Sequence, residues 1–420
     1  MHFLYNMIYM DNNGTTLMSA DTQKALLKWC NKGNPSASYK SATDCKNMLN
    51  TLRLKVAEIC GVKSTHEIVL TSGASEANST AITSIINHML DARRQLAFKQ
   101  NLANIVPPHV IVSAIEHKSI LSAVESFLDR QLISLTKIIP NSDGVITLKS
   151  ISDAVTDYTT FVIVMHANNE TGAINDIASI SKFCAANNII FHSDIVQTFG
   201  KIPPKSPLIH SMSLSFHKLY GPPGCGAWIV SKSLAKNLQP AIFGTQNNGL
   251  RGGTENVIGF GATLCALAEN FHDRANKNAK LQNLKEHALR LFCQVLPCIT
   301  YSQYVSDRRE KKPELELIIF SQSPTNSLCN TILISVVKRT PPKICNVKIK
   351  EFLERNNVII SVGSACNTSS AKASHVLYAM NADEFIRAGA LRISFGDYNT
   401  LAEVKKCVTL FAKAIQMQCY

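Results

Sequence analysis

The sequence predicts an α/β fold with a mainly parallel sheet and a second, smaller α+β domain, and three observations support this. From about residue 65, short apolar runs alternate with longer amphipathic stretches, as in a chain of βαβ units. The apolar runs are continuous, which is typical of strands that are buried on both faces. After about residue 258 the pattern changes to long helical stretches, and 420 residues are enough for two domains.

The individual elements follow in chain order. In the first part we expect a helix that begins at Ser75 and four strands, at 67–71, 109–114, 161–165 and 188–192. In the second part we expect one long helical region over 259–295, an irregular stretch with Pro313 and Pro324, a strand at 331–337 and a helix at 347–355. The stretch 301–328 resembles an insertion, and we interpret it as a surface loop. These elements assign 20–258 to a large domain, and 1–19 with 259–420 to a small one.

The composition is ordinary for a globular protein, with 45% hydrophobic and 17% charged residues. We find no run of about 18 apolar residues that would predict a membrane span, and no signal-peptide pattern at the N-terminus. The net charge of +13 would suit nucleic acid or another acidic partner. Because no nucleic-acid-binding motif accompanies it, we favour a basic protein with exposed charged loops.

The chain has thirteen cysteines, an odd number, and none form a C-x-x-C pair. This argues against both a disulfide framework and a zinc site. A reducing compartment, the cytoplasm, fits best, and most of these cysteines are expected to be small buried hydrophobic residues.

Two turns carry residues that suit a phosphate-bearing cofactor. In 71–76 (TSGASE), Gly73 allows a tight turn, and the helix N-terminus after it could bind phosphate together with the Ser75 hydroxyl. Many βα turns share this pattern, so alone it is weak. In 213–222 (SLSFHKLYGP), Lys218 follows two serines and a histidine. A lysine in a buried polar turn has a lowered pKa and can form a Schiff base, although a His-Lys dipeptide alone is more often on the surface.

Two further residues are candidates for chemistry. Asp194 follows an apolar strand, where α/β proteins place their ligands, and its carboxylate would suit a pyridinium nitrogen. Alone, it would more often cap the next helix. Cys366 lies in the small, polar segment 361–369 (SVGSACNTS), where an exposed reactive thiol would be found. By composition, however, it is one cysteine among thirteen.

The order of the motifs resembles that of the NifS-type (group I) cysteine desulfurases, in the class-V aminotransferase family. The matching segments are 11–16 (DNNGTT), 33–36 (GNPS), 71–78 (TSGASEAN), 116–117 (EH), 168–172 (NNETG), 213–227 (SLSFHKLYGPPGCGA), 251–257 (RGGTENV), 361–367 (SVGSACN), 374–377 (SHVL) and 391–394 (LRIS). They cover nearly the whole chain. Its divergent sequence is most similar to NifS-like proteins of large DNA viruses.

The resemblance implies a fold type I enzyme that depends on pyridoxal phosphate and acts as a homodimer with shared sites. The resemblance implies that Lys218 forms a Schiff base with the cofactor and that His117 stacks on its ring and transfers protons. It also implies that Asp194 contacts the pyridine nitrogen and Gln197 the phenolic oxygen. The implied phosphate-binding residues are Ala74, Ser75, Ser215, His217 and the neighbouring subunit's Thr254.

The resemblance also implies the substrate and the reaction. Asn169 and Arg392 would hold the carboxylate of L-cysteine, which an arginine fork can bind in a bidentate way. Cys366, in the small domain, would take the sulfur as a persulfide and leave L-alanine. The acceptor protein that receives this sulfur next, in iron–sulfur assembly or elsewhere, is not readable from the sequence.

The chain departs from the family pattern at several positions, the most notable being Phe216, Tyr39, Asn175, Pro223, Asn247 and Asp397. Phe216 is large for its position, and overpacking there would cost about 1–3 kcal/mol unless neighbours are smaller. It could also alter cofactor affinity. Two alternatives therefore stay open: a related lyase or aminotransferase on the same fold, and a binding or scaffold protein without turnover.

Overall fold

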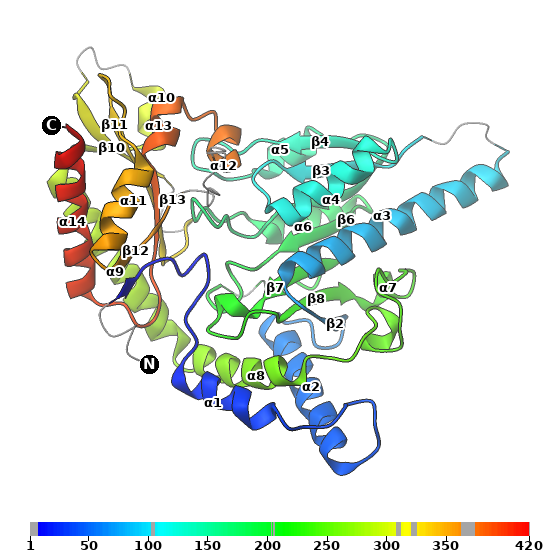
Figure 1. The fold of residues 1–420 in the computed structure, drawn as a ribbon. Coiled ribbons are helices and arrows are strands. Elements are labelled where there is room, and N and C mark those ends of the chain that lie inside the picture. The colour runs from blue at the N-terminus through cyan, green and yellow to red at the C-terminus, as the bar shows by residue number, and fades with distance from the viewer. Residues whose placement is uncertain are drawn as a thin grey trace.

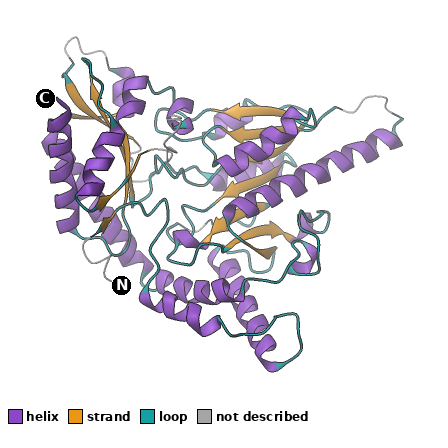
Figure 2. Ribbon diagram, in the orientation of Figure 1, coloured by secondary structure: helices purple, strands orange, loops and turns teal. Residues whose placement is uncertain are grey.

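The computed structural model contains two separate β-sheets with helices packed around them (Figure 1). It describes residues 7–101, 106–202, 204, 206–307, 312–320, 326–362 and 374–419. The larger sheet comes from the first part of the chain and the smaller one from the last part (Figure 1), and Figure 2 shows the strands of both sheets in orange. The predicted α/β class with an additional α+β part is therefore confirmed.

The larger sheet has seven strands in the order β2-β8-β7-β6-β5-β3-β4. Its strands are β2 (His66–Thr71), β3 (His109–Ser113), β4 (Ser134–Ile138), β5 (Thr159–Ile163), β6 (Ile190–Asp194), β7 (Ser211–Ser215) and β8 (Gly226–Ser231). β8 runs antiparallel to both of its neighbours, and the other pairs are parallel. The four strands expected from the sequence are β2, β3, β5 and β6, each within two residues at either end.

Helices cover both faces of this sheet, which explains its continuous apolar strands. One face packs on α3 (Ala74–Lys99) and α4 (Lys118–Asp129), and the other on α2 (Lys40–Ile59) and α6 (Ile177–Ala186). The short helix α5 (Leu148–Ser152) and the 3-10 turn η1 (Phe216–Lys218) connect strands, whereas α7 (Lys232–Ala235) and the 3-10 turn η2 (Asn247–Gly249) follow the last strand of this sheet. The predicted helix after residue 75 is confirmed as α3.

The smaller sheet has five strands in the order β13-β14-β11-β10-β9, and β1 pairs separately with β12. The strands are β1 (Ile8–Tyr9), β9 (Cys298–Thr300), β10 (Leu315–Phe320), β11 (Thr331–Lys338), β12 (Val358–Ile359), β13 (Ser361–Val362) and β14 (Ala390–Ser394). Its helices are α9 (Arg274–Val295), α10 (Tyr301–Ser306), α11 (Asn346–Arg355), α12 (His375–Ala379), α13 (Glu384–Gly389) and α14 (Leu401–Cys419). A core that includes Phe292 and Phe411, with ring centroids 4.9 Å apart, holds α9 and α14 together.

The N-terminal segment lies against the smaller sheet, since β1 pairs with β12 and Asp11 bridges to Ser394. α8 (Val257–Phe271), in contrast, packs on α1 (Ala20–Trp29) and α2 beside the larger sheet (Figure 1). The exact boundary between the two predicted domains stays a prediction.

Two expectations about the second part of the chain are wrong. The helical region over 259–295 is two helices, because Asp273 takes a left-handed conformation (φ 55°) that separates α8 from α9. The stretch 301–328 is more than a surface loop: it contains α10 and β10, and β10 pairs with β9 and β11 inside the sheet. Its run LELIIF is apolar enough to be buried there.

Across the described ranges, no helix combines the length and the apolar character that a membrane crossing needs.

Candidate functional site

The predicted site residues gather at the carboxyl ends of the parallel strands, beside the smaller sheet. Here the described residues enclose a cavity of about 640 Å³. The larger sheet contributes Asp194 at the end of β6 and Ser215 at the end of β7, and the smaller sheet contributes Arg392 from β14. This is the edge at which parallel α/β sheets bind ligands.

Lys218 ends η1, the 3-10 turn directly after β7. Its Nζ donates hydrogen bonds to the backbone carbonyls of Asn13, at 2.5 Å, and Gly14. Burial lowers the pKa of Lys218 to about 7, and the positive charge of Arg392 acts in the same direction. The amine is therefore available in its neutral, nucleophilic form near neutral pH.

Asp194 is buried, and its two oxygens accept hydrogen bonds from different groups. Asn78 Nδ2 donates to Oδ2 at 2.9 Å, and the backbone N–H of Val196 donates to Oδ1 at 2.9 Å. Burial raises the pKa of Asp194, and these two bonds oppose that effect. A turn follows Asp194 in place of a helix, so the helix-cap interpretation is wrong. A buried carboxylate in this position gains most from a cationic partner.

The N-terminus of α3 and the end of β7 form one wall of the cavity. Ala74 and Ser75 begin α3, and both line the cavity with Ser215 and His217. Gly226 on β8 makes this wall possible, because a Cβ there would lie 2.6 Å from the Cα of Gly73.

His217 lies beside this wall and packs against the N-terminal segment. Its Nδ1 lies 3.0 Å from Thr15 Oγ1. Burial, with a smaller contribution from the charge of Lys218, lowers the pKa of His217 to about 4. The ring is therefore neutral at physiological pH and can take part in hydrogen bonding without adding charge.

Arg392 faces the same cavity from the smaller sheet. Its Nη2 pairs with Asp11 Oδ1 at 2.6 Å, and its Nη1 donates to the backbone carbonyl of Asn169 at 3.1 Å. Its buried Nε has no partner among the described residues. The guanidinium is thus held in place by Asp11, a residue to which the sequence analysis assigned no role.

Gln197 lines the cavity beyond Asp194. Its Nε2 donates to the Asn13 carbonyl at 3.2 Å, while its buried Oε1 has no partner in the described part of the chain. Asn13 thus accepts from both Gln197 and Lys218 and ties them together. The motif 11–16 was the signal for this segment, but the sequence did not reveal that its backbone carbonyls would meet the lysine.

His117 is the N-cap of α4, and its exposed side chain lies at the rim of the cavity. Its Nδ1 accepts from the backbone N–H of Ser119 at 3.1 Å. Desolvation lowers its pKa, against the charge of Asp194, which raises it. Glu116, next to it, was not singled out by the sequence analysis; it is fully buried, and burial raises its pKa to about 8.

Two predicted residues are not among those that line this cavity in the described part of the chain, for different reasons. Thr254 is exposed and does not line it. Cys366 lies outside the described residues. Two residues near either side of that segment, Ser361 and His375, do line the cavity.

The departures from the family pattern are accommodated in different ways. Tyr39 is exposed, and its hydroxyl accepts from the Asn34 N–H at 3.1 Å. Asn175 is buried and bonds to backbone at both ends of its amide. Pro223 lines the cavity, whereas Phe216 does not. Phe216 is buried in the core, and an effect on cofactor affinity stays a prediction.

Comparison with known proteins shows the family of this chain: a family model described as aminotransferase class-V matches residues 8–407. The chain belongs to the class-V aminotransferase family. Cysteine desulfurase IscS of Methanosarcina thermophila is 30% identical to this member of the family, over 97% of this chain and 92% of the relative. The resemblance drawn from the motifs is therefore confirmed, while the likeness to viral members stays a prediction.

Solved structures agree with this assignment. A NifS-like protein is similar with a TM-score of 0.79 and 25% identity, over 98% of this chain and all (100%) of the other. SspA in complex with cysteine is similar with a TM-score of 0.68 and 27% identity, over 94% of this chain and 100% of the other.

Proposed function

We propose that this chain is a pyridoxal-phosphate-dependent cysteine desulfurase, which converts L-cysteine to L-alanine and takes the sulfur on Cys366. The observation that carries the proposal is one cavity that holds a lysine amine of lowered pKa, a buried carboxylate and an arginine fork: Lys218, Asp194 and Arg392. The relatives named cysteine desulfurase and the similar protein solved with cysteine support the substrate.

The polar groups of the cavity fit pyridoxal phosphate. Asp194 is a buried carboxylate that would pair with a pyridinium nitrogen, and the unpartnered Oε1 of Gln197 marks a polar position nearby. The start of α3, with Ser75, would bind phosphate together with Ser215 and His217. When bound, the cofactor supplies an electron sink that stabilises negative charge on the α-carbon of an amino acid.

Protons are handled by residues of this chain. An amine with a pKa near 7 can both accept and return a proton at physiological pH, so Lys218 is suited to remove the substrate's α-proton. His117, at the rim of the cavity, is the second candidate for proton transfer. Arg392 would orient the substrate through its carboxylate, with the Asn169 side chain beside it.

Sulfur transfer needs a nucleophilic thiol, and the motif 361–367 assigns it to Cys366. Its thiolate attacks the substrate sulfur: an S–S bond forms, the C–S bond breaks, and the electron pair stays with the carbon. That carbon then takes a proton and leaves as alanine, and Cys366 carries a persulfide for an acceptor protein.

A homodimer with shared sites explains why Thr254 is exposed away from the cavity of its own chain. A second hollow of about 730 Å³ lies on this surface, lined by residues that include Arg53 and Glu255. Phe243, near the same segment, is 78% exposed. In the proposed dimer this surface is covered, and Thr254 reaches the phosphate site of the partner subunit.

We further propose that the protein works in a reducing compartment, the cytoplasm. All the cysteines that the structure describes are free thiols, including buried ones such as Cys60 and Cys184. Burial raises the pKa of both thiols to about 12, which keeps them unreactive.

The test is to supply purified protein with pyridoxal phosphate and L-cysteine and to measure alanine and, with a thiol reductant, sulfide. We expect both products in equal amounts. Cys366→Ala and Lys218→Ala should each abolish sulfide release, while Cys30→Ala, at an exposed cysteine, should not. Alanine formation that survives Cys366→Ala would indicate a different lyase reaction, and no visible absorption band with the cofactor would favour a scaffold.

A further inference from the structure

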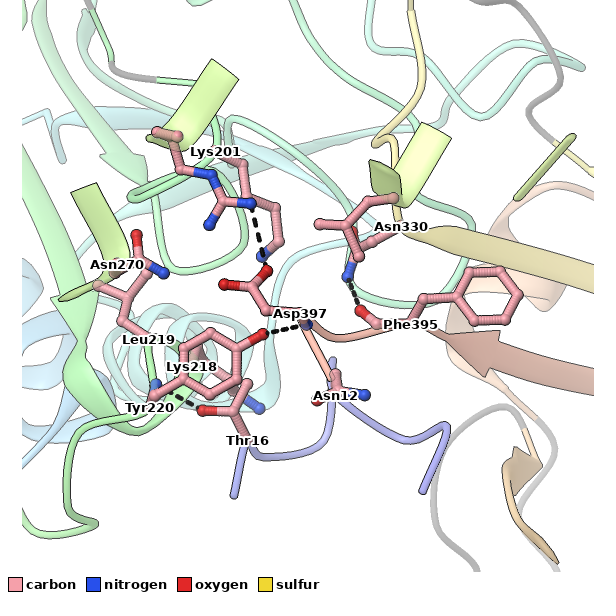
Figure 3. A pocket seen from close by; sticks show the side chains of 12 residues that line it. Asn12, Thr16, Lys201, Lys218, Leu219, Tyr220, Asn270, Asn330, Phe395 and Asp397 are labelled. Atoms are coloured by element: carbon pink, nitrogen blue, oxygen red, sulfur yellow. Dashed lines mark hydrogen bonds and ion pairs between the residues drawn. The ribbon is translucent and has the colours of Figure 1, made fainter. Parts of the chain in front are cut away.

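Lys218 also lines a second, much smaller cavity, of about 10 Å³ (Figure 3). This volume has room for a single water-sized molecule. Lys201 lines the same cavity, together with the side chains of Tyr220 and Asp397. Two lysines, from segments before and after β7, thus share one enclosed space.

The charges around this space are not evenly neutralised. Among the residues that line it, Arg274 pairs with Asp397 at 3.3 Å. Lys201, in contrast, forms no ion pair with any carboxylate in the part of the chain that the structure describes. A charge on Lys201 is therefore not neutralised by an ion pair, and it acts on the nearby amine of Lys218.

Lys201 is also connected to the amine of Lys218 through hydrogen bonds. Its Nζ donates to the backbone carbonyl of Gln197 at 3.1 Å, and Gln197 Nε2 donates to the carbonyl of Asn13 at 3.2 Å. The same Asn13 oxygen accepts from Lys218 Nζ at 2.5 Å. A change at Lys201 can therefore act on Lys218 through its charge or through this chain of bonds.

We propose that Lys201 is a positioning residue for the proposed desulfurase reaction, whose positive charge adds to the burial of Lys218 and to the charge of Arg392 in keeping the amine of Lys218 neutral. This inference rests on the proposed function of Lys218. Burial lowers the pKa of Lys201 itself to about 8; Cys329 and, to a smaller extent, the negative charge of Asp397 oppose that effect, while Arg274 adds to it. At neutral pH most of Lys201 is therefore still charged, while Lys218, with a pKa of about 7, has already lost much of its charge.

Other charged or titratable groups also face Lys218. They are Arg392 of β14, Asp11 of the N-terminal segment, Asp194 of β6, His117 at the start of α4 and His217 of η1. A substitution at Lys201 leaves all of them in place, so a change in the titration of Lys218 can be assigned to Lys201.

The experiment measures the titration of Lys218 in the cofactor-free chain. Lysines are reductively methylated with isotope-labelled methyl groups, the Lys218 signal is assigned by its loss in Lys218→Arg, and its chemical shift is followed with pH. In Lys201→Met we expect the pKa of Lys218 to rise by about one unit, which leaves about fivefold less neutral amine at pH 7. Lys201→Arg should leave it unchanged, as should Lys182→Met on the exposed face of α6.

Lys201→Gln separates the two routes, because its amide can still donate to the Gln197 carbonyl but carries no charge. A rise in the pKa of Lys218 in both the Met and the Gln variants supports an effect of the Lys201 charge. A rise in Met alone, or no rise in either, overturns the proposal. In the loaded enzyme, the acid limb of the kcat profile should move to higher pH in the Gln variant.

The two hypotheses fail separately. If wild-type protein does not bind pyridoxal phosphate at Lys218, the proposed function fails, while the titration of the cofactor-free chain still decides whether Lys201 controls that amine.

Discussion

Replacing Lys218 by methionine should stabilise the cofactor-free chain near neutral pH, although it removes the proposed catalytic group. The reason is that burial makes the charged amine unfavourable in the folded state. In the unfolded chain, the amine titrates near its ordinary pKa and keeps its proton over a wide pH range. Methionine has a similar length and no charge to bury.

The magnitude follows from the pKa of Lys218, which falls from 10.5 to about 7. At about 1.4 kcal/mol per pKa unit, this difference of about 3.5 corresponds to about 5 kcal/mol below pH 7, before solvent in the open cavity screens part of it. The variant also leaves the carbonyls of Asn13 and Gly14 without this donor, at about 1–3 kcal/mol in total. We expect a net gain of about 2 kcal/mol at pH 6.5.

The sign of the pH dependence is fixed by the same pKa values. Between about pH 7 and pH 10.5 the unfolded chain binds a proton at Lys218 that the folded chain does not. Wild-type stability therefore rises with pH through this window, and the advantage of Lys218→Met shrinks by up to about 1.4 kcal/mol per pH unit. Near pH 9 the variant should have lost its advantage.

Urea unfolding of both cofactor-free proteins between pH 6.5 and 9.5 measures this difference. Lys182→Met, at an exposed lysine on α6, is the matched control and should track the wild type at every pH. A difference that does not change with pH, or a variant that is less stable than the wild type at pH 6.5, would refute the reasoning. With pyridoxal phosphate present the order should reverse, since only the wild type can gain from cofactor binding at Lys218.

Three further predictions concern the same cavity. Asp194→Asn should lower kcat by about 10²–10³-fold, because the amide cannot neutralise a cationic ring, and steady-state alanine formation measures this. Arg392→Lys should raise KM for L-cysteine with a smaller change in kcat, since an ammonium group cannot provide a bidentate fork; an unchanged KM would contradict the assignment. Ser374→Ala should lower the unfolding free energy by about 1–2 kcal/mol in urea, because it removes both the cap of α12 and the 2.5 Å bond to buried Glu170.

Much of the larger sheet could be predicted from the sequence because its strands are buried on both faces. Such strands are continuous apolar runs, as at β3 and β5, and they stand out without any knowledge of their neighbours. The site residues at strand ends, such as Asp194, follow from the same logic. Which of these residues share one site depends on contacts between distant segments. The order of the motifs was needed to group them.

The errors lie where local sequence is ambiguous. Asp273 carries the left-handed turn that splits α8 from α9, a conformation that aspartate tolerates without requiring it. β10 follows a charged, proline-containing segment, and its apolar run was therefore interpreted as part of a surface loop. No pattern in the sequence indicated a role for Lys201. Its burial depends on α9, whose Asn278 bonds to the Lys201 carbonyl from 77 positions further along the chain.

Phe216 shows how a departure from the family pattern can leave the site intact. Along the end of β7 and into η1, Ser215 and His217 line the cavity, while Phe216 between them turns into the core. There its ring packs edge-on against Phe199, with centroids 6.4 Å apart and an interplanar angle of 74°.

A glycine lies close to the backbone and the Cβ of Phe216. A Cβ added at Gly221 would lie 3.2 Å from the Cβ of Phe216 and 2.9 Å from its carbonyl oxygen, so no larger residue fits there without movement. The extra volume of Phe216 is thus taken up on the core side of the turn, away from the cavity. Phe216 was one of the departures that kept open a scaffold protein without turnover, and its place in the core gives that hypothesis no support from the lining of the cavity.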